Sequence, residues 1–176
     1  MGTRSYIAKQ ISDDQYLTIF CHYNGYPEEN GAMLVQHYNT PERVDALLAL
    51  GDLYYLQEKV APVPGTSHSH DNAQPGVTIA YQRDEGYTGC EATIQTLEGI
   101  NDPEPEGIEF TYFFSLNGQW LYFPTGEAEF GIRNVKEDLD ADMVRYGSFY
   151  SELLDDLGLL ADEPEEPEDH LSLTQI

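Results

Sequence analysis

Two histidines and an aspartate in the segment "TSHSHDN" have the types and spacing best suited to metal chemistry. His68 and His70 are separated by one residue, and Asp71 follows directly. A zinc site needs three or four converging ligands, but Ala73 stands where a further histidine would extend the run. We therefore expect a polar loop, and we keep a metal site at these three residues as the alternative.

Cys21 and His22 form the second candidate, since a thiol beside an imidazole could act as a nucleophile. Adjacent residues of a strand point to opposite faces, so these two side chains would not pair directly. We expect Cys21 to be a small buried core residue. The sequence also lacks a phosphate-binding glycine loop, a Gly-x-Ser-x-Gly elbow and a CxxC pair. It therefore favours a non-enzymatic protein without a cofactor.

The third candidate is a calcium loop in "DLDADM". Asp138, Asp140 and Asp142 occupy the first, third and fifth positions of the pattern. Met143 replaces the glycine required at the sixth position, and Phe149 replaces the glutamate at the twelfth. These two departures exclude an EF-hand.

Net charge is the property that points most clearly to a function. The chain has 176 residues, and 32 Asp and Glu against 8 Lys and Arg give a net charge of −24. Such a charge repels nucleic acids and anionic membrane surfaces, but it attracts basic protein surfaces. We expect a basic DNA- or RNA-binding protein as the partner, with no direct binding to nucleic acid or membranes.

The spacing of the acids suggests how such a partner would be bound. Carboxylates three or four residues apart on a helix lie about 5–6 Å from each other, and a DNA strand carries a charge about every 3.4 Å. An acidic face could therefore imitate DNA; the alternative is that the acids only keep the chain soluble. The candidate contact residues are Glu98, Asp102, Glu104, Glu106, Glu109, Asp138, Asp142, Glu152, Asp155 and Asp156.

The segment "CHYNGYPEENG" (21–31) is expected to join a strand to a helix. Asn24-Gly25 favours a tight turn with positive φ. Pro27 suits the first position of the following helix, and Glu28 and Glu29 suit its positive end. This segment is therefore predicted to be a structural joint rather than a catalytic loop.

Periodicity and turn signals predict the other elements. "NTPERVDALLALGD" is the clearest helix, with Thr40 as N-cap, Pro41 at the first helical position and Gly51 at the end. Asn117-Gly118 predicts a hairpin with a two-residue type I′ turn. In chain order, we expect strands 3–10 and 15–22, helices 28–38 and 39–52, a loop at 61–76, strand 77–83, a strand-like segment at 90–100, hairpin 108–123 and helix 139–157.

This order predicts a single α+β domain over residues 1–160, with an antiparallel sheet and two or three packed helices. Residues 161–176 begin with six acids and two prolines in nine residues, so they should form an acidic flexible tail. The chain shows no apolar signal region and no run long enough to span a membrane, and it has only two cysteines. A cytoplasmic protein is therefore expected.

The segments "MGTRSYIA", "FCHYNGYPEENGAMLVQHYNTPERVDALLALGDL" and "QPGVTIAYQRDEG" carry a resemblance. Over residues 2–87 the chain resembles a family of small bacteriophage, prophage and plasmid proteins with "GTRS", "CH-aromatic-DGYP", "HYNT" and "LGD" motifs. Asn24 stands where that family usually has Asp, and the acidic C-terminal extension is particular to this chain. The resemblance implies an accessory gene of mobile DNA at work in a bacterial cell. Such genes often encode inhibitors of host defence, several of which are acidic DNA mimics.

We therefore expect a DNA-mimic inhibitor of a restriction or CRISPR component. One alternative is a metal- or small-ligand-binding or hydrolytic protein that uses residues 21–31 with His68 and His70. Another is a structural virion accessory protein that assembles through the aromatic surface of hairpin 108–123. The sequence leaves the oligomeric state open.

Overall fold

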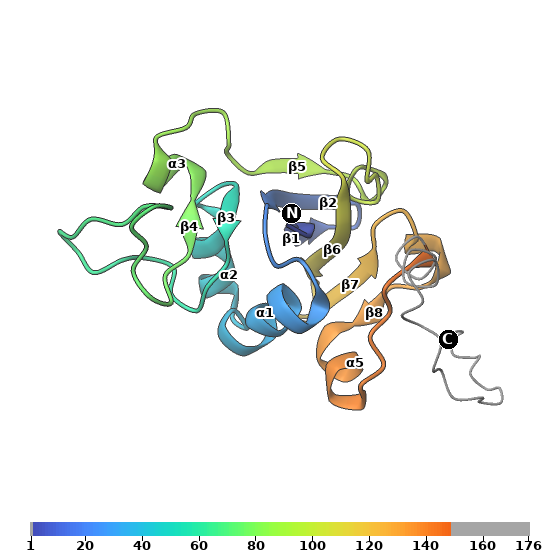
Figure 1. Cartoon of the computed structure of the whole chain (residues 1–176). Helices are drawn as coiled ribbons and strands as arrows, with labels where there is room; N and C mark the ends of the chain where they lie inside the picture. The colour runs from blue at the N-terminus through green and yellow to red at the C-terminus, as the bar shows by residue number, and fades with distance from the viewer. Residues whose placement is uncertain (1, 149–176) are drawn as a thin grey trace. The chain divides into compact units, whose positions relative to one another are not determined.

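Strand β1 (Arg4–Ser12) is the central strand of the sheet in the computed structural model, which describes residues 2–148 (Figure 1). It pairs antiparallel with β2 (Gln15–Cys21), from Ser5 opposite Cys21 to Ser12 opposite Gln15. Both strands and the turn between them were expected from their alternating residues. Residues 2–145 belong to one unit, which the following paragraphs describe.

The sheet is mixed, with strand order β4-β3-β2-β1-β6-β7-β8 and β5 paired with β2. β6 runs parallel to β1, and β3 runs parallel to β2. The α+β single-domain class is confirmed, but the expectation of a wholly antiparallel sheet is wrong. Turn signals in the sequence predict the relative direction of strands only where a tight turn joins them. β6 pairs with β1 after a long crossover connection, so no turn signal indicates its direction. The remaining strands are β3 (Leu53–Tyr55), β4 (Ile79–Ala80), β5 (Thr93–Gln95), β6 (Ile108–Phe114), β7 (Trp120–Pro124) and β8 (Arg133–Asn134).

The hairpin of β6 and β7 is confirmed, but its turn is not type I′. That turn requires positive φ at both central residues, and among residues 2–148 the non-glycine residues with positive φ are Asn24 and Asp142. Gly118 has φ +78°, and its N–H donates to the Ser115 carbonyl at 2.9 Å. The loop is therefore the longer form in which glycine follows the turn in the left-handed region.

The first two expected helices are confirmed. The Thr40 hydroxyl oxygen accepts a hydrogen bond from the Arg43 N–H, as an N-cap residue should. Asn24 has φ +63°, and Pro27 begins a π-helical turn with Glu28 and Glu29 at its start. The helical segments are η1 (Pro27–Gly31, a π-helix), α1 (Ala32–His37), α2 (Pro41–Leu48), α3 (Tyr81–Glu85), α4 (Leu97–Ile100), η2 (Ala128–Phe130, a 3₁₀ helix) and α5 (Val135–Ala141).

Two expected elements are corrected. The strand expected at 77–83 is limited to Ile79–Ala80, because α3 begins at Tyr81 and the Asp84 carboxylate accepts the Ala80 N–H. The helix expected at 139–157 does not continue from α5 through residues 142–148, since Asp142 adopts the left-handed conformation with φ +56° and closes α5. Its second half and the tail at 161–176 lie outside the described residues.

One face of the sheet packs against η1, α1, α2 and α5. The indole N–H of Trp120 donates to the Tyr38 carbonyl at 2.7 Å, which fixes the end of α1 against β7. Val44, Leu47 and Leu48 of α2 are buried, as their spacing predicts. Tyr122 on β7 donates to Asp138 of α5 at 2.7 Å. These bonds hold the helices in fixed positions over the sheet.

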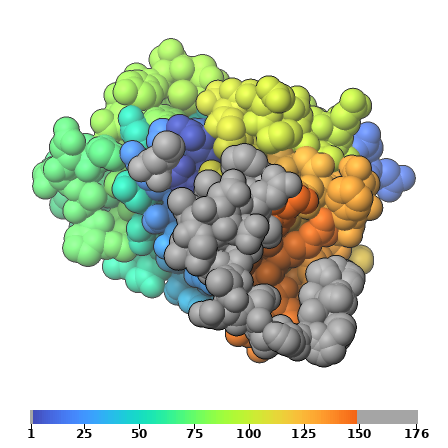
Figure 2. Space-filling model, turned by 45° about the vertical axis from the view of Figure 1, so that its right-hand side comes forward, coloured from blue at the N-terminus to red at the C-terminus, as the bar shows by residue number. Residues whose placement is uncertain are grey.

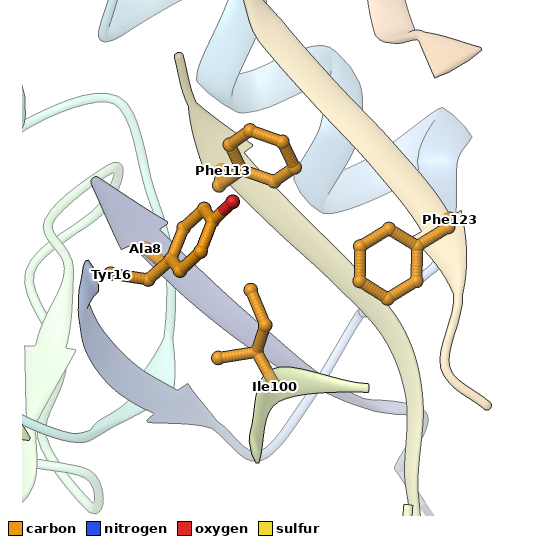
Figure 3. Packing of buried hydrophobic residues seen from close by; sticks show 5 residues of the cluster. All are labelled: Ala8, Tyr16, Ile100, Phe113 and Phe123. Atoms are coloured by element: carbon orange, nitrogen blue, oxygen red, sulfur yellow. The ribbon is translucent and has the colours of Figure 1, made fainter. Parts of the chain in front are cut away.

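The opposite face holds a smaller apolar cluster beside α4. Figure 3 shows Ala8, Tyr16, Ile100, Phe113 and Phe123, which come from β1, β2, α4, β6 and β7. The Tyr16 and Phe113 rings meet edge to face, with centroids 5.1 Å apart. The hairpin aromatics are thus buried on both faces, so they do not form the assembly surface that the virion hypothesis requires.

Residues 21–31 pack closely against the N-terminal segment. The Gly25 N–H donates to the Thr3 carbonyl at 2.9 Å, and the Tyr112 hydroxyl donates to the Gly25 carbonyl at 2.5 Å. A Cβ added to Gly25 would lie 2.7 Å from the Thr3 oxygen, so glycine is required by close backbone contact. The joint expected from the sequence is therefore also a central packing contact.

We expect Gly25→Ala to lower the free energy of unfolding by about 2 kcal/mol, because the new methyl group would collide with backbone atoms. Gly65→Ala is the control: Gly65 also has positive φ, but a Cβ there meets nothing within 4 Å. Its cost should be about 1 kcal/mol from conformation alone. Urea unfolding measures both variants, and a smaller loss for Gly25→Ala than for Gly65→Ala would contradict the packing argument.

Candidate functional site

The three residues proposed as metal ligands have separate roles. The buried His68 ring uses both nitrogens: Nδ1 accepts the Gln74 N–H at 3.0 Å, and Nε2 lies 3.1 Å from the Thr78 carbonyl, to which it donates. His70 packs against Tyr54, with ring centroids 4.6 Å apart. Asp71 is exposed. Among residues 2–148, no group of three or more metal-binding side chains is close enough to hold an ion.

Cys21 is a buried core residue, as expected. Burial raises the pKa of its thiol to about 12, although the Asn30 side chain lies 3.5 Å from the sulfur and partly offsets the shift. The thiol is neutral at physiological pH, and the neutral form is a poor nucleophile. Cys21 therefore supports the fold rather than chemistry.

Five of the ten acids proposed as partner contacts are exposed on one short segment. They lie on α4, on the loop that follows it and at the start of β6, in the yellow-green part of Figure 2. None of the five takes part in an ion pair within residues 2–148. These acids are Glu98, Asp102, Glu104, Glu106 and Glu109.

Most basic side chains are held elsewhere in the fold. Five of the eight form ion pairs with acids outside the 98–109 segment, and the Arg43 guanidinium donates to the carbonyls of His37 and Glu58. Arg4 is the exception, since its guanidinium lies beside Gly107 and its charge opposes the burial that raises the pKa of Glu109. Five acids near one base leave the 98–109 segment with a net negative charge. The five ion pairs are Lys9–Asp45, Arg83–Asp84, Arg133–Asp138, Lys136–Asp140 and Arg145–Glu127.

Asp138 is wrongly assigned as a partner contact. It is only 6% exposed, and its carboxylate accepts hydrogen bonds from the Arg133 guanidinium and the Tyr122 hydroxyl. A buried carboxylate with such partners holds α5 on the sheet and is not available to a second protein. Asp142 is exposed, whereas Glu152, Asp155 and Asp156 lie outside the described residues.

A surface of aromatic and histidine rings was not expected from the sequence. It contains His22 and Tyr23 after β2, Tyr54 and Tyr55 of β3, His70 of the loop, and Tyr81 and Tyr87 of α3 and the turn that follows it. We call these seven residues the aromatic surface. Neighbouring rings are in contact: Tyr54 and Tyr81 have centroids 4.1 Å apart, and Tyr23 and Tyr55 stack at 4.5 Å. β3, β4 and α3 lie together at one end of the sheet in Figure 1.

Three groups of this surface have pKa values shifted toward their neutral forms. Burial, with a smaller effect of Arg4, lowers the pKa of His22, whose Nδ1 lies 3.1 Å from the Tyr81 hydroxyl. A hydrogen bond with Tyr87 raises the pKa of Tyr54 to about 12. Burial raises the pKa of Tyr81, and the neighbouring Tyr54 adds to this shift. The rings of His22, Tyr54 and Tyr81 therefore offer hydroxyl and imidazole groups largely without a charge of their own.

Asp52 lies at the base of this surface and positions it. Its carboxylate accepts the Phe20 N–H at 2.9 Å, and its carbonyl accepts the Tyr81 N–H at 3.1 Å. Burial raises the pKa of Asp52 to about 6, while the bond from Phe20 opposes this shift. Asp52 thus links β2 to the first residue of α3 at an electrostatic cost.

A pocket of about 410 Å³ is lined by part of the 21–31 segment, by α1 and by Leu56 and Gln57. Glu28, Glu29 and the amides of Asn24, Gln36 and Gln57 contribute to its lining. Neither His68 nor His70 lines it. The ligand-binding hypothesis requires one site that combines residues 21–31 with His68 and His70. The structure does not form such a site, because the pocket is lined by neither histidine, and His22, Tyr23 and His70 lie on the aromatic surface.

Comparisons of the chain with models of protein families, with curated proteins and with solved structures find no significant match. Within residues 2–148, no helix combines the length and apolar character needed to cross a membrane. The geometry and charge of the described residues therefore carry most of the functional inference.

We expect Asp138→Ala to lower the free energy of unfolding by about 3 kcal/mol, because Arg133 and Tyr122 lose a shared buried acceptor. Asp140→Ala removes only an exposed partner of Lys136 and should cost less than about 0.5 kcal/mol. Urea unfolding followed by circular dichroism compares the two variants. Similar losses would show that Asp138 does not anchor α5.

We expect Asp52→Asn to change how stability depends on pH. The pKa of this carboxyl is raised from 3.8 to about 6, so the folded state binds more protons than the unfolded state between these values. The wild-type free energy of unfolding therefore falls as pH rises through this window. The shift corresponds to about 3 kcal/mol, which partial solvent exposure reduces to about 1 kcal/mol.

Asp52→Asn keeps an acceptor for the Phe20 N–H but has no carboxylate. It should match the wild type near pH 4 and be about 1 kcal/mol more stable at pH 7. Asp52→Ala loses the acceptor and should be less stable than Asp52→Asn at both pH values. Thermal unfolding from pH 4 to pH 7 provides the test, and an unchanged pH profile for Asp52→Asn would contradict the raised pKa.

Proposed function

We propose that this chain is a non-enzymatic protein that binds a basic surface of a DNA- or RNA-binding host protein and competes there with nucleic acid. The observation that carries this proposal is the exposed set of acids at 98–109, none of which forms an ion pair within residues 2–148, while five of the eight bases pair with acids elsewhere. Complementary charge accelerates encounter and directs a partner to one surface. Asp138 is not part of this contact.

The backbone of the acidic segment is held in place, which supports a binding role. The Asn101 side-chain oxygen accepts the N–H groups of Gly126 and Ala128 at 2.8 and 3.1 Å. Asp102 accepts the Glu104 N–H at 3.0 Å, and the Pro103 carbonyl accepts the Ile108 N–H at 3.1 Å. An ordered loop loses less conformational entropy when a partner binds.

The resemblance to proteins of mobile DNA supports the setting that we propose. In that setting the chain acts in the cytoplasm of a bacterial cell, and the partner is a restriction or CRISPR component. Both kinds of protein hold nucleic acid through Lys and Arg, which is the chemistry that the acidic segment complements. The metal-dependent alternative is not favoured, because both His68 ring nitrogens already have protein partners.

We expect the chain to displace a labelled DNA duplex from a purified restriction endonuclease or CRISPR effector at low salt, and less so as salt rises. Fluorescence anisotropy of the duplex measures this. A variant with five side-chain amides in place of carboxylates should compete about ten-fold or more weakly. Its substitutions are Glu98→Gln, Asp102→Asn, Glu104→Gln, Glu106→Gln and Glu109→Gln.

The control variant removes the same number of charges from other exposed positions and should lose less than about three-fold. Its substitutions are Asp13→Asn, Glu42→Gln, Glu91→Gln, Glu129→Gln and Glu137→Gln. Equal losses in the two variants would mean that only net charge matters. Failure of the wild-type chain to displace DNA from any of these proteins at low salt would refute the proposal.

A further inference from the structure

The aromatic surface consists of five tyrosines and two histidines that lie outside the buried core. Its seven residues come from four separate segments, and none of them is fully buried. Tyr87 is 53% exposed, although it stacks on Tyr81 with centroids 5.6 Å apart. Partly exposed tyrosines in mutual contact provide large, rigid contact areas, and tyrosine is enriched where proteins bind one another.

The charged groups around this surface determine whether it favours a positively or a negatively charged ligand. The Glu85 carboxylate accepts the His70 N–H at 2.6 Å, and Asp71 lies 3.5 Å from the His70 ring. Asp52 and Glu106 act electrostatically on Tyr81 and His22 respectively. The basic groups that act on this surface are Arg4 and, more weakly, the N-terminal amino group, both through their effect on His22. Four carboxylates outnumber these two basic groups, which opposes a phosphate and favours a cation.

The same fold already contains the contact that such a cation would make. The Arg43 guanidinium carbon lies 4.7 Å from the centre of the Tyr38 ring. A flat guanidinium group can stack on a ring while its N–H groups bond to nearby acceptors, whereas the ammonium group of lysine is compact and strongly hydrated. The nearby carboxylates supply such acceptors on the aromatic surface.

We propose that the aromatic surface binds arginine side chains presented by a basic partner protein, with guanidinium groups stacked on the exposed rings of Tyr87 and its neighbours. This inference rests on the proposed function, since it identifies where the same partner is recognised. The acidic segment attracts any basic surface, and the aromatic surface selects arginine over lysine.

The test uses the full chain and two capped peptides of equal length and charge, one of alternating glycine and arginine and one of alternating glycine and lysine. Calorimetric titration measures both affinities at about 0.15 M salt. We expect the arginine peptide to bind about five-fold or more tightly. Equal affinity for the two peptides would overturn the inference. Tighter binding of an oligothymidine than of the arginine peptide would also overturn it.

Variants locate the site. Tyr87→Ala and His70→Ala should reduce the preference for arginine, while Tyr87→Phe should keep it, because the ring and not the hydroxyl makes the contact. Phe130→Ala is the matched control: it removes a ring that is 65% exposed on η2, outside the aromatic surface, and should change nothing. A preference unchanged in Tyr87→Ala and His70→Ala would place arginine binding elsewhere and refute the inference.

The two proposals fail in distinguishable ways. The variant without the five acids also lacks Glu106, one of the four carboxylates near the aromatic surface, so it should weaken the binding of both peptides. The preference for arginine should remain, because the rings and the carboxylates of Asp52, Asp71 and Glu85 are unchanged. If the preference is found but no DNA is displaced from a nucleic-acid-binding protein, the proposed function is wrong and the arginine site stands. If DNA is displaced but the peptides bind equally, only the arginine site is wrong.

Discussion

The contact between the N-terminal segment and residues 21–31 is the constraint on which the rest of the structure depends. Gly25 is fixed from two sides, by the Thr3 carbonyl and by the Tyr112 hydroxyl of β6. The buried Asn30 side chain adds bonds to Ser5 and to the Tyr23 carbonyl. Together they hold β1, η1 and β6 in register and direct His22 and Tyr23 away from the core. The same segment therefore supports the fold on one side and the aromatic surface on the other.

Sequence reasoning succeeded where the determining interaction is local. Thr40 and Pro41 mark the start of α2, and the alternation around Cys21 identifies a strand with one buried face. It failed where the interaction joins distant segments. No local signal shows that β6 runs parallel to β1. The helical spacing after Asp138 did not reveal that Asp142 would end α5 in the left-handed conformation, an outcome that short polar side chains tolerate.

The candidate site follows the same rule: features set by local sequence were predicted, and features set by contacts between distant segments were not. Exposure of Asp102, Glu104 and Glu106 follows from the composition of their loop, residues 101–107, which includes two prolines and a glycine. Burial of Asp138 could not be read from its helix, because its partners Arg133 and Tyr122 precede that helix and lie on two strands. The aromatic surface was missed for a related reason: its rings come from four segments with no common spacing, and only the mixed sheet brings them together.

The central position of β1 also has a kinetic consequence. Its partner on one side, β2, follows after a tight turn, but its partner on the other side, β6, begins only at Ile108. During synthesis the β6-facing edge of β1 stays unpaired until that strand has left the ribosome. Pairings over such separations slow folding, and an open strand edge invites association between chains. The high negative charge counteracts this hazard, because nascent chains that repel one another associate less readily.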